Sequence, residues 1–504
     1  MEGLFTSAAS SEHSRALNAD EETNYGTESR IVSERTSLLR GNTEIPSHDL
    51  DGSKSTTTWQ LEAKVISKSS APLILTFLLQ YSLPIASIVT VGQIGKAELG
   101  AVSLASMTAS ITGWTVYAGL STSLDTLCSQ AYGAGHHHLV GLQLQRMLYF
   151  IWFVSIPIAI IWFFGTQILS RIVPEPETAR LAGLYLKVLI LGAPGYGTFE
   201  AGKRYMQAQG LFRPTMYILL TCAPLNALMH YAFVWKLKWG FVGAPIAVAI
   251  TQNLMSFLLL LYVWLVDGSQ CWGGFDRKAL KNWMPMIKLA LPGLIMVLAE
   301  FLAYEITTLS ASWLGSTPLF AAQSVLASLT TIMFQIPFPL SVAASTRIAN
   351  SIGAGSTRRA RTTAQVAMVF AAAVGILNLS VVSILRNYIP RLVTRDEEVI
   401  DLVSKMLPLC ATYQLFDALA CNCNGILRGL GRQEVGGYVG LFAYYVIGLP
   451  IGLGTGFGAG WGLYGLWGGL AVALGLVFIV ESIFIYRASW EHAVDEARRR
   501  NSIG

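Results

Sequence analysis

Long apolar segments recur along the chain from about residue 69 to residue 486, separated by short polar stretches. Each is long enough to cross a bilayer core of about 30 Å, which takes about 20 helical residues. Because a helix satisfies its own backbone hydrogen bonds in lipid, each segment predicts a membrane-spanning helix. The predicted spans are 69–92, 101–124, 145–169, 182–205, 214–235, 242–266, 286–313, 319–345, 362–385, 400–426, 435–455 and 462–486.

An internal repeat at an offset of 220 residues relates the first six spans to the last six. Residues 123–135 align with residues 343–355, and Gln80 of the first span aligns with Glu300 of the seventh. Six is an even number, so both copies cross in the same orientation and are related by an axis along the membrane normal. We therefore predict an all-α integral membrane protein with 12 transmembrane helices in two pseudo-symmetric six-helix bundles.

The pattern divides the chain into five parts. Residues 1–60 contain 18 Ser or Thr and little periodic hydrophobicity, so we expect a disordered cytosolic tail. No basic start leads into a short apolar segment, so we expect the first span, not a cleavable signal peptide, to direct insertion. The other parts are an N-terminal six-helix lobe (61–268), a cytosolic interlobe linker (269–284), a C-terminal six-helix lobe (285–488) and a cytosolic C-terminal tail (489–504).

Composition and charge agree with a membrane protein. Apolar residues make up 53% of the chain and charged residues 13%, about half the usual share in soluble proteins. The net charge of +5 is dispersed and forms no basic stripe, so we expect no nucleic-acid partner. Lys and Arg collect in alternate loops, including the one with Arg358 and Arg361, which predicts that both termini are cytosolic. The six cysteines are scattered, and we interpret them as packing residues rather than disulfides or metal ligands.

The seventh and tenth predicted spans carry acids near their centres, and these demand an explanation because a carboxylate at the centre of a span costs about 2.5–3.5 kcal/mol on insertion scales. In the seventh span, Glu300 shares a polar helical face with Tyr304, and Glu305 lies about 140° further round. The tenth span has a polar face that includes Tyr413, Gln414, Asp417 and Asn424.

These faces predict that Glu300 and Asp417 line one water-accessible cavity in the C-terminal lobe. With Glu305, they are our candidates for cation coupling, since a carboxylate can hold a proton, a sodium ion or a cationic substrate. We expect Tyr304, Tyr413, Gln414 and Asn424 to line the same cavity. The alternative is that the acids only accept structural hydrogen bonds between helices.

The N-terminal lobe has polar side chains but no acid at the matching positions. Gln80, Ser87 and Asn226 are candidates for substrate contacts, with interhelical hydrogen bonding as the alternative. Glu200 has helical ion-pair spacing to Lys203 and Arg204, which predicts pairing near a cytosolic helix end.

Other charged positions suggest anchoring or sorting. Asp125 and Arg347 lie near equivalent ends of the second and eighth spans, and we interpret them as helix-terminus anchors. In the N-terminal tail, Glu34, Leu38 and Leu39 form an acidic dileucine pattern, which would recruit a sorting adaptor and direct the protein to a vacuolar or lysosomal membrane.

Several short motifs, taken together and in order, resemble eukaryotic transporters of the multidrug and toxic compound extrusion (MATE) family, of fungal-like type. They are Leu78–Ser82, Ser123–Gly135, Gln207–Gly210, Glu300–Glu305, Leu415–Ala420 and Gly425–Gln433. The resemblance implies two bundles in a V shape that alternate between facing in and out, with Glu300 and Asp417 matching the acids assigned to coupling. Many bacterial members have an Asp where this chain has Ser87, and that departure favours proton coupling in the C-terminal lobe.

The resemblance implies an antiporter that exports organic cations, xenobiotics or metabolites in exchange for protons, less readily for sodium ions. It implies no enzymatic activity, no catalytic residue, no cofactor and no metal site, and we expect a monomer in the vacuolar, lysosomal or plasma membrane. One alternative is a lipid-linked oligosaccharide flippase of the same superfamily, which should have a more basic cavity. Another is a membrane-embedded enzyme, which would need catalytic groups in the spans, where His230 is the one histidine.

Overall fold

The structure, a computed structural model, describes residues 58–173, 175–315 and 317–502, and the regular elements in these ranges are helical. Eleven helical segments in this part of the chain are long and apolar enough to cross a membrane. Each of the eleven overlaps one predicted span, which confirms those crossings. The predicted sorting residues Glu34, Leu38 and Leu39 lie outside the described residues.

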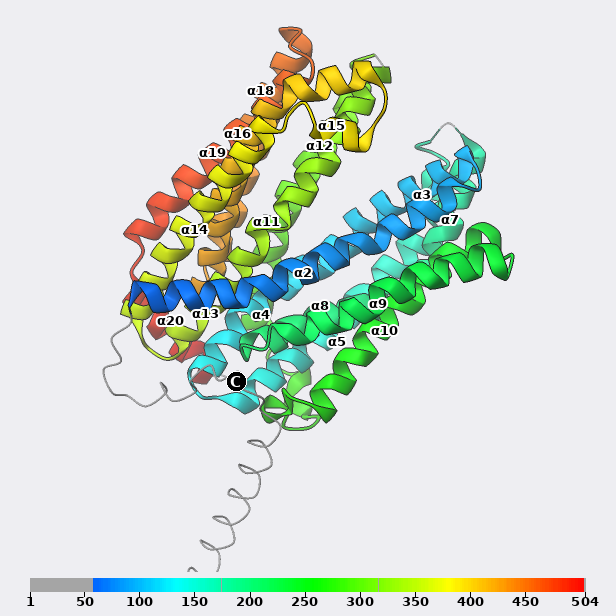
Figure 1. Ribbon diagram of the computed structural model, residues 1–504. Helices are drawn as coiled ribbons and strands as arrows, with labels where there is room; N and C mark the ends of the chain where they lie inside the picture. Colours follow the sequence, from blue (N-terminus) through cyan, green and yellow to red (C-terminus); the bar gives the residue numbers. More distant parts are fainter. Residues whose placement is uncertain (1–57, 174, 316, 503–504) are drawn as a thin grey trace, which may run out of the picture. The chain divides into compact units, whose positions relative to one another are not determined.

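The first half of the chain contains the helices coloured blue to green in Figure 1. They are α2 (Trp59–Gly92), α3 (Lys96–Ala109), α4 (Thr115–Gly133), α5 (His137–Phe163), α6 (Gly165–Leu169), α7 (Pro176–Leu189), α8 (Ala193–Ala208), α9 (Arg213–Tyr231) and α10 (Gly243–Leu265). A π-helical turn, Ser110–Trp114, joins α3 to α4 into one crossing.

The second half repeats this order in the helices coloured green to red. They are α11 (Met284–Ser312), α12 (Thr317–Phe334), α13 (Pro337–Gly353), α14 (Thr357–Ile384), α15 (Ile389–Val393), α16 (Glu397–Leu430), α17 (Gln433–Leu441), α18 (Leu449–Leu453), α19 (Leu463–Arg487) and α20 (Trp490–Ser502). The eighth crossing consists of α12 and α13, and the eleventh of α17, α18 and the π-helical turns that follow each.

The fourth predicted span is present but broken into α7 and α8. Pro194 lies in the first turn of α8, and a proline there lacks an N–H and clashes with the carbonyl one turn earlier. The break is compensated by Asn253 of α10, whose Nδ2 donates to the backbone carbonyl of Leu191 at 2.9 Å. Such a break is tolerated at membrane depth when a neighbouring helix satisfies the freed backbone group. It accounts for eleven continuous segments where the pattern predicts twelve.

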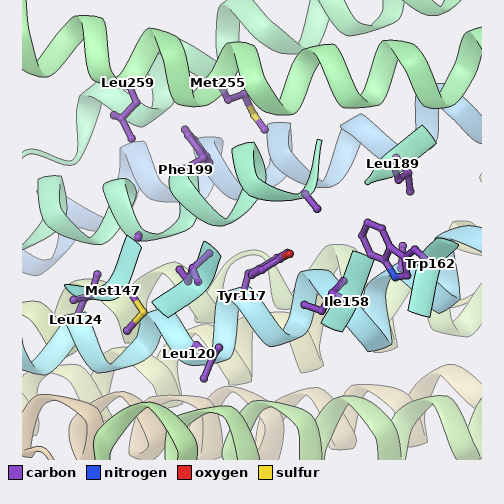
Figure 2. Close-up of a cluster of buried hydrophobic side chains, with 14 of the residues drawn as sticks. Tyr117, Leu120, Leu124, Met147, Ile158, Trp162, Leu189, Phe199, Met255 and Leu259 are labelled. Carbon is purple, nitrogen blue, oxygen red and sulfur yellow. The ribbon is translucent and has the colours of Figure 1, made fainter. Parts of the chain in front are cut away.

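The apolar core of the first half lies between α4, α5, α8 and α10 (Figure 2). Its large aromatic side chains are fully buried, and their polar atoms have partners. Tyr117 donates to Ser155 Oγ at 2.8 Å, and Trp162 Nε1 donates to Thr112 Oγ1 at 2.8 Å. These bonds avoid the cost of a buried unsatisfied donor and fix the rings that separate the four helices.

The two halves contact each other through related helices. Helix α4 packs on α11 and α13, and α2 packs on α13 and α14. The ends of the described chain lie on the same side, since Trp59 contacts the Phe370 ring of α14 and Glu491 of α20 pairs with Arg361 of α14. An even number of crossings requires this arrangement, so the two-bundle fold of 12 helices is confirmed.

The interlobe linker and the C-terminal tail both pack on the bundles. Gln145 of α5 holds the linker, because its Nε2 donates to the Gly274 carbonyl at 2.8 Å and its Oε1 accepts from the Asp276 N–H at 3.1 Å. The tail forms α20, in which Arg500 donates to Gln130 Oε1 of α4 at 3.0 Å and Glu496 pairs with Arg432 at 3.0 Å. Helix α20 therefore contacts both halves.

Candidate functional site

A cavity of about 430 Å³ lies in the second half, chiefly between α11, α12 and α16. It contains all the C-terminal residues that the sequence nominates. Its polar and charged lining includes Glu300, Tyr304, Glu305, Thr330, Thr331, Tyr413, Gln414, Asp417, Asn424 and Arg428. Tyr81 of α2 and Ser110 also reach it, so the first half contributes to its wall. The structure thus brings Glu300 and Asp417 to one cavity, as their helical faces predict.

Asp417 has an incomplete set of hydrogen bonds. It is 2% exposed, and its Oδ2 accepts from Gln414 Nε2 at 3.4 Å. Gln414 is fixed in turn by a bond to the Thr330 carbonyl at 3.2 Å. The other oxygen, Oδ1, is buried with no hydrogen-bond partner among the described residues. A proton or a positive ion from the cavity would have no competing donor at that oxygen.

Glu300 and Glu305 both line the cavity, although helical geometry puts them on different faces of α11. Glu305 therefore borders the cavity with Glu300 although it lies off the polar face of α11. The cavity covers a wide part of α11, because Val297 and Phe301 belong to its lining as well as Glu300 and Tyr304. A cavity that spans so much of a helix collects side chains about 140° apart.

Aromatic side chains form one wall of the cavity. Tyr304 shares a hydrogen bond with Thr330 Oγ1 at 2.9 Å, and Trp467 packs edge-on against Tyr304 and Tyr413, with ring centroids 6.0 and 5.2 Å apart. Trp467 is fully buried and donates to Gln323 Oε1 at 2.8 Å. Trp467 was not predicted from the sequence, where its one signal is a large aromatic with a polar atom inside an apolar span. It holds the two tyrosines in place.

The first half has its own cavity of about 240 Å³, which differs in chemistry. Gln80, Tyr185, Tyr196 and Asn226 line it, and no charged side chain belongs to its lining. Asn226 is already engaged with Thr251 Oγ1 at 2.9 Å and the Leu83 carbonyl at 3.2 Å. The structure places Gln80 and Asn226 at this cavity, where they were nominated as substrate contacts.

Ser87 lies behind that cavity rather than in its wall. It is 1% exposed, receives a bond from Tyr185 OH at 3.1 Å and lies 2.6 Å from His230 Nε2. His230 Nδ1 lies 2.8 Å from the Asn226 carbonyl, so Nδ1 carries the proton and Nε2 accepts from Ser87. Ser87 is therefore occupied by interhelical bonding, the alternative left open for it.

Glu200 and Lys203 form the predicted helical ion pair, with Nζ and Oε1 2.7 Å apart. Its location differs from the prediction, because both side chains are buried and Gln80 bonds to each of them. The predicted interfacial placement near a cytosolic helix end is therefore wrong. Arg204 has a different partner, Asp125.

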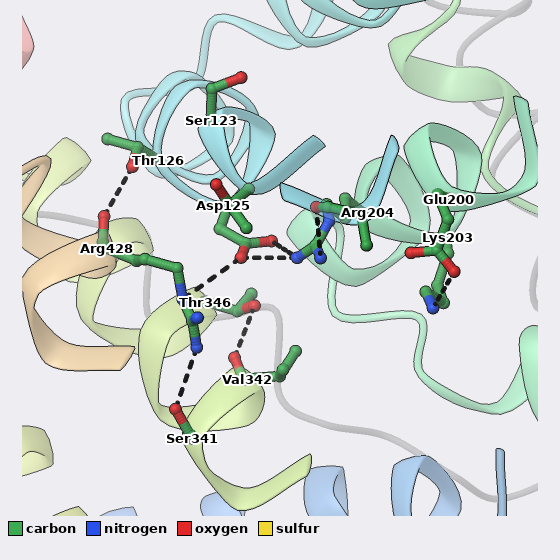
Figure 3. A network of polar contacts seen from close by, with 12 residues as sticks. Ser123, Asp125, Thr126, Glu200, Lys203, Arg204, Ser341, Val342, Thr346 and Arg428 are labelled. Atoms are coloured by element: carbon green, nitrogen blue, oxygen red, sulfur yellow. Dashed lines mark hydrogen bonds and ion pairs between the residues drawn. The ribbon is translucent and has the colours of Figure 1, made fainter. Parts of the chain in front are cut away.

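Asp125 and Arg347 are not helix-terminus anchors, and that interpretation is also wrong. Asp125 is 2% exposed in α4, and both of its carboxylate oxygens lie 2.6 Å from Arg204 Nη1 of α8 (Figure 3). Arg428 of α16 approaches the same carboxylate from the other half, with Nε 3.7 Å from Oδ2. Arg347 pairs with Glu62 of α2 at 2.9 Å. The two ion pairs, Asp125 with Arg204 and Glu62 with Arg347, therefore join different helices inside the protein.

The repeat relates the two cavities position by position. Gln80 corresponds to Glu300, and each lines the cavity of its own half. Gly210 and Gly431 adopt left-handed conformations after α8 and α16, and Tyr196 and Asp417 lie the same number of residues before them. The second half thus has two acids where the first half has an amide and a phenol.

Comparison with known proteins gives one consistent family. The MatE family model matches residues 72–232 and 292–453, one match in each half. An uncharacterised transporter of Saccharomyces cerevisiae is 44% identical over 86% of this chain, which spans 62% of that protein's length. Multidrug and toxin extrusion protein 2 of Mus musculus is 33% identical over 87% of this chain and 77% of its own length.

A solved structure agrees. The crystal structure of the eukaryotic MATE transporter AtDTX14 superimposes with a TM-score of 0.84 at 30% identity, covering 88% of this chain and 99% of that one. The two family-model matches fall one in each repeat, and the second contains Glu300 and Asp417. The chain belongs to the MATE family of multidrug and toxin extrusion transporters.

Proposed function

We propose that the protein is a secondary antiporter that exports organic cations, among them xenobiotics or metabolites, in exchange for protons. One observation carries this proposal: Glu300 and Asp417 lie at a single cavity beside ordered aromatic rings, and Asp417 Oδ1 lacks a hydrogen-bond donor among the described residues. An acid that holds either a proton or a cation, one at a time, is the minimum requirement for exchange.

The cavity suits a small organic cation. Its volume of about 430 Å³ falls within the usual range of about 300–1,000 Å³ for small-molecule sites. Carboxylates supply charge complementarity, and tyrosine faces attract cations with about 0.5–2 kcal/mol each. Three acids face one guanidinium in the lining, which argues against the basic cavity that a lipid-linked oligosaccharide flippase should have.

Proton exchange is energetically sufficient for such a carrier. A membrane potential supplies about 2.3 kcal/mol per charge per 100 mV, and a tenfold proton gradient supplies about 1.4 kcal/mol. Protons are favoured over sodium ions as the coupling ion because one basic oxygen suffices to hold a proton. A sodium site would need several oxygen ligands to replace the ion's hydration shell.

The test uses the full chain in proteoliposomes loaded with a fluorescent organic cation. We expect Asp417→Asn and Glu300→Gln to abolish transport driven by a pH gradient. Asp401→Asn is the matched control, since Asp401 lies on the same helix but is exposed and pairs with Lys405. Wild-type transport by Asp417→Asn would overturn the proposal. Transport driven by a sodium gradient alone would overturn its proton part.

We also propose that both termini are cytosolic and that the protein resides in a vacuolar or lysosomal membrane. Arg358 and Arg361 begin α14 beside Trp59 and α20, and basic residues collect on the cytosolic side. Epitope tags at either end should be accessible to protease on intact vacuoles, and protection of the tags from protease would overturn this orientation.

Alanine at Leu38 and Leu39 should move a fluorescent copy of the protein to another membrane, and an unchanged distribution would refute the sorting signal.

A further inference from the structure

Arg428 belongs to two sites at once. It lines the cavity that contains Glu300 and Asp417, and its Nε lies 3.7 Å from Asp125 Oδ2 of the other half. The side chain is 3% exposed, and its Nη2 donates to Ser341 Oγ of α13 at 3.0 Å (Figure 3). No other charged residue of the cavity lining makes an ion pair with the first half in the described part of the chain.

The charges around Arg428 do not balance within the contact between the halves. Arg204 holds both oxygens of Asp125 at 2.6 Å, which already neutralises that carboxylate. Arg428 has the longer contact, and its Nε makes no hydrogen bond among the described residues. The cluster therefore contains two guanidiniums and one carboxylate, and a buried uncompensated charge is strongly unfavourable.

The remaining compensation must come from acids on the elements packed around Arg428. Those without an ion-pair partner among the described residues are Glu300 and Glu305 of α11, Asp417 of α16 and Glu481 of α19. The other nearby acids are engaged: Glu200 with Lys203 on α8, Glu62 of α2 with Arg347 on α13, and Glu434 of α17 and Glu496 of α20 with Arg432. Of these four acids, Glu300, Glu305 and Asp417 line the cavity with Arg428 and are thus its counter-charges.

The helix turn that carries Arg428 also holds the halves together through its backbone. Thr126 Oγ1 donates to the Arg428 carbonyl at 2.6 Å, and Gln130 Nε2 donates to the Gly429 carbonyl at 3.2 Å. Gln433 Nε2 then donates to Thr126 Oγ1 at 3.0 Å. A displacement of this turn would therefore disturb several bonds between the halves together.

We propose that Arg428 is the positioning residue that couples the charge of the acid cavity to the contact between the two halves. This inference rests on the proposed exchange at Glu300 and Asp417. When those acids are ionised and empty, they draw the guanidinium toward the cavity and weaken its contact with Asp125. When a proton or a cationic cargo neutralises them, Arg428 turns to Asp125 and the contact tightens. Loading of the site thereby selects the conformation.

The experiment measures the separation of the halves with spin labels on the full chain in lipid nanodiscs. Labels at His136→Cys and Ala354→Cys report it, because both positions are exposed, follow equivalent helices α4 and α13, and belong to different halves. The native cysteines are buried and leave these two thiols to react. The shorter-distance population should fall roughly twofold between about pH 6 and about pH 8 in the otherwise unchanged protein.

Arg428→Gln should remove this pH dependence and abolish transport. It leaves Asp125 paired with Arg204, so the cluster becomes neutral and the fold is retained. Arg428→Lys preserves the charge and should restore part of the pH response, which a merely structural role would not predict. Arg361→Gln, at an exposed pair with Glu491, is the matched control and should respond like the unchanged protein. Asp417→Asn should keep the short distance at both pH values.

Two outcomes separate the inference from the proposed function. A wild-type pH response in Arg428→Gln, with transport lost in Asp417→Asn, would overturn the role of Arg428 and leave exchange at the acids intact. Wild-type transport by Asp417→Asn would overturn the proposed function itself. If Arg428→Gln fails to fold, an Arg428→Lys protein without any pH response would overturn the inference.

Discussion

Gly133 and Gly353 occupy reciprocal places where α4 crosses α13. A methyl group on Gly133 would collide with the Asn350 carbonyl, and one on Gly353 would collide with the Gln130 carbonyl. The 220-residue offset of the repeat relates Gly133 to Gly353 and Gln130 to Asn350, so each contact is the counterpart of the other. The pseudo-symmetry axis therefore passes through this crossing. The two halves therefore meet backbone to backbone, close to the bonds formed by Thr126 and Gln130.

Alanine at Gly133 or Gly353 should destabilise the protein, because the obstructing atoms are backbone and cannot rotate away. We expect a loss of about 1–3 kcal/mol, the usual cost of overpacking a tight contact. Gly468→Ala is the control, since a methyl group on this glycine of α19 has no neighbour within 4 Å. Thermal unfolding in detergent measures the difference. Equal melting of Gly133→Ala and Gly468→Ala would show that the crossing can widen freely.

Replacement of Glu62, near the start of α2, should destabilise the protein. It is fully buried and accepts from Arg347 Nε at 3.0 Å, Arg347 Nη2 at 2.9 Å and Thr363 Oγ1 at 2.9 Å. Glu62→Gln leaves a guanidinium with one partner fewer and should cost about 2–4 kcal/mol, less than in a fully buried pair because Arg347 is partly exposed.

The exposed pair of Lys405 with Asp401 is the comparison for Glu62. Lys405→Gln should leave the free energy of unfolding nearly unchanged, because solvent screens the pair. Denaturant unfolding of Glu62→Gln and Lys405→Gln measures how much each variant loses in free energy of unfolding. Similar losses in the two would mean that the Glu62 bridge contributes no more than a surface contact.

The sequence predicts the crossings well, because a span needs only length and apolar composition. It predicts the cavity from the helical spacing of Glu300 and Asp417 for the same reason: local geometry fixes which side chains share a face. It cannot place contacts between distant helices. Asp125 reads as an anchor near a helix end until α16 brings Arg428 against it from the other half.

The break in the fourth span and the helix in the tail show the same limit. Pro194 signals a possible interruption, but Asn253, which makes the break tolerable, lies on another helix. Residues 490–502 are polar enough to suggest a free tail, and they are ordered because Trp490 is buried and Arg500 reaches Gln130. In both cases the deciding partner is far away in the sequence.

Cys271 should be unreactive although it lies in the linker outside the spans. Burial raises the pKa of its thiol to about 12, and nearby Asp267 adds to the shift. Since the thiolate is the reactive form and the pH stays far below 12, maleimide labelling should remain slow from about pH 7 to about pH 9. Ser269→Cys in a Cys271→Ser background is the control, because position 269 is exposed.

We expect labelling of Cys271 to be at least about 100-fold slower than that of the control thiol, whose pKa should stay near the ordinary value of about 8.5. Labelling of the control should accelerate as the pH rises toward that value. Mass spectrometry of the linker peptide measures both rates. Comparable rates would mean that the linker opens readily from α5, where Gln145 holds it.

Glu481 of α19 is an acid that was not nominated from the sequence and that the proposed exchange does not use. It is fully buried, and neither carboxylate oxygen has a hydrogen-bond partner among the described residues. Methionine has similar length and no polar oxygen, so Glu481→Met should stabilise the protein by about 1–3 kcal/mol. Glu481→Gln should gain less, because its amide would also lack partners.

Thermal unfolding and transport, measured on the same Glu481 variants, separate two explanations. A buried polar group that destabilises a membrane protein is usually retained for function. Higher stability with loss of pH-driven transport would therefore assign Glu481 to the proton path, together with Glu300 and Asp417. Higher stability with normal transport would make it a dispensable defect in packing. Lower stability of Glu481→Met would contradict the prediction, because it would mean that the carboxyl group has a favourable partner in the folded protein.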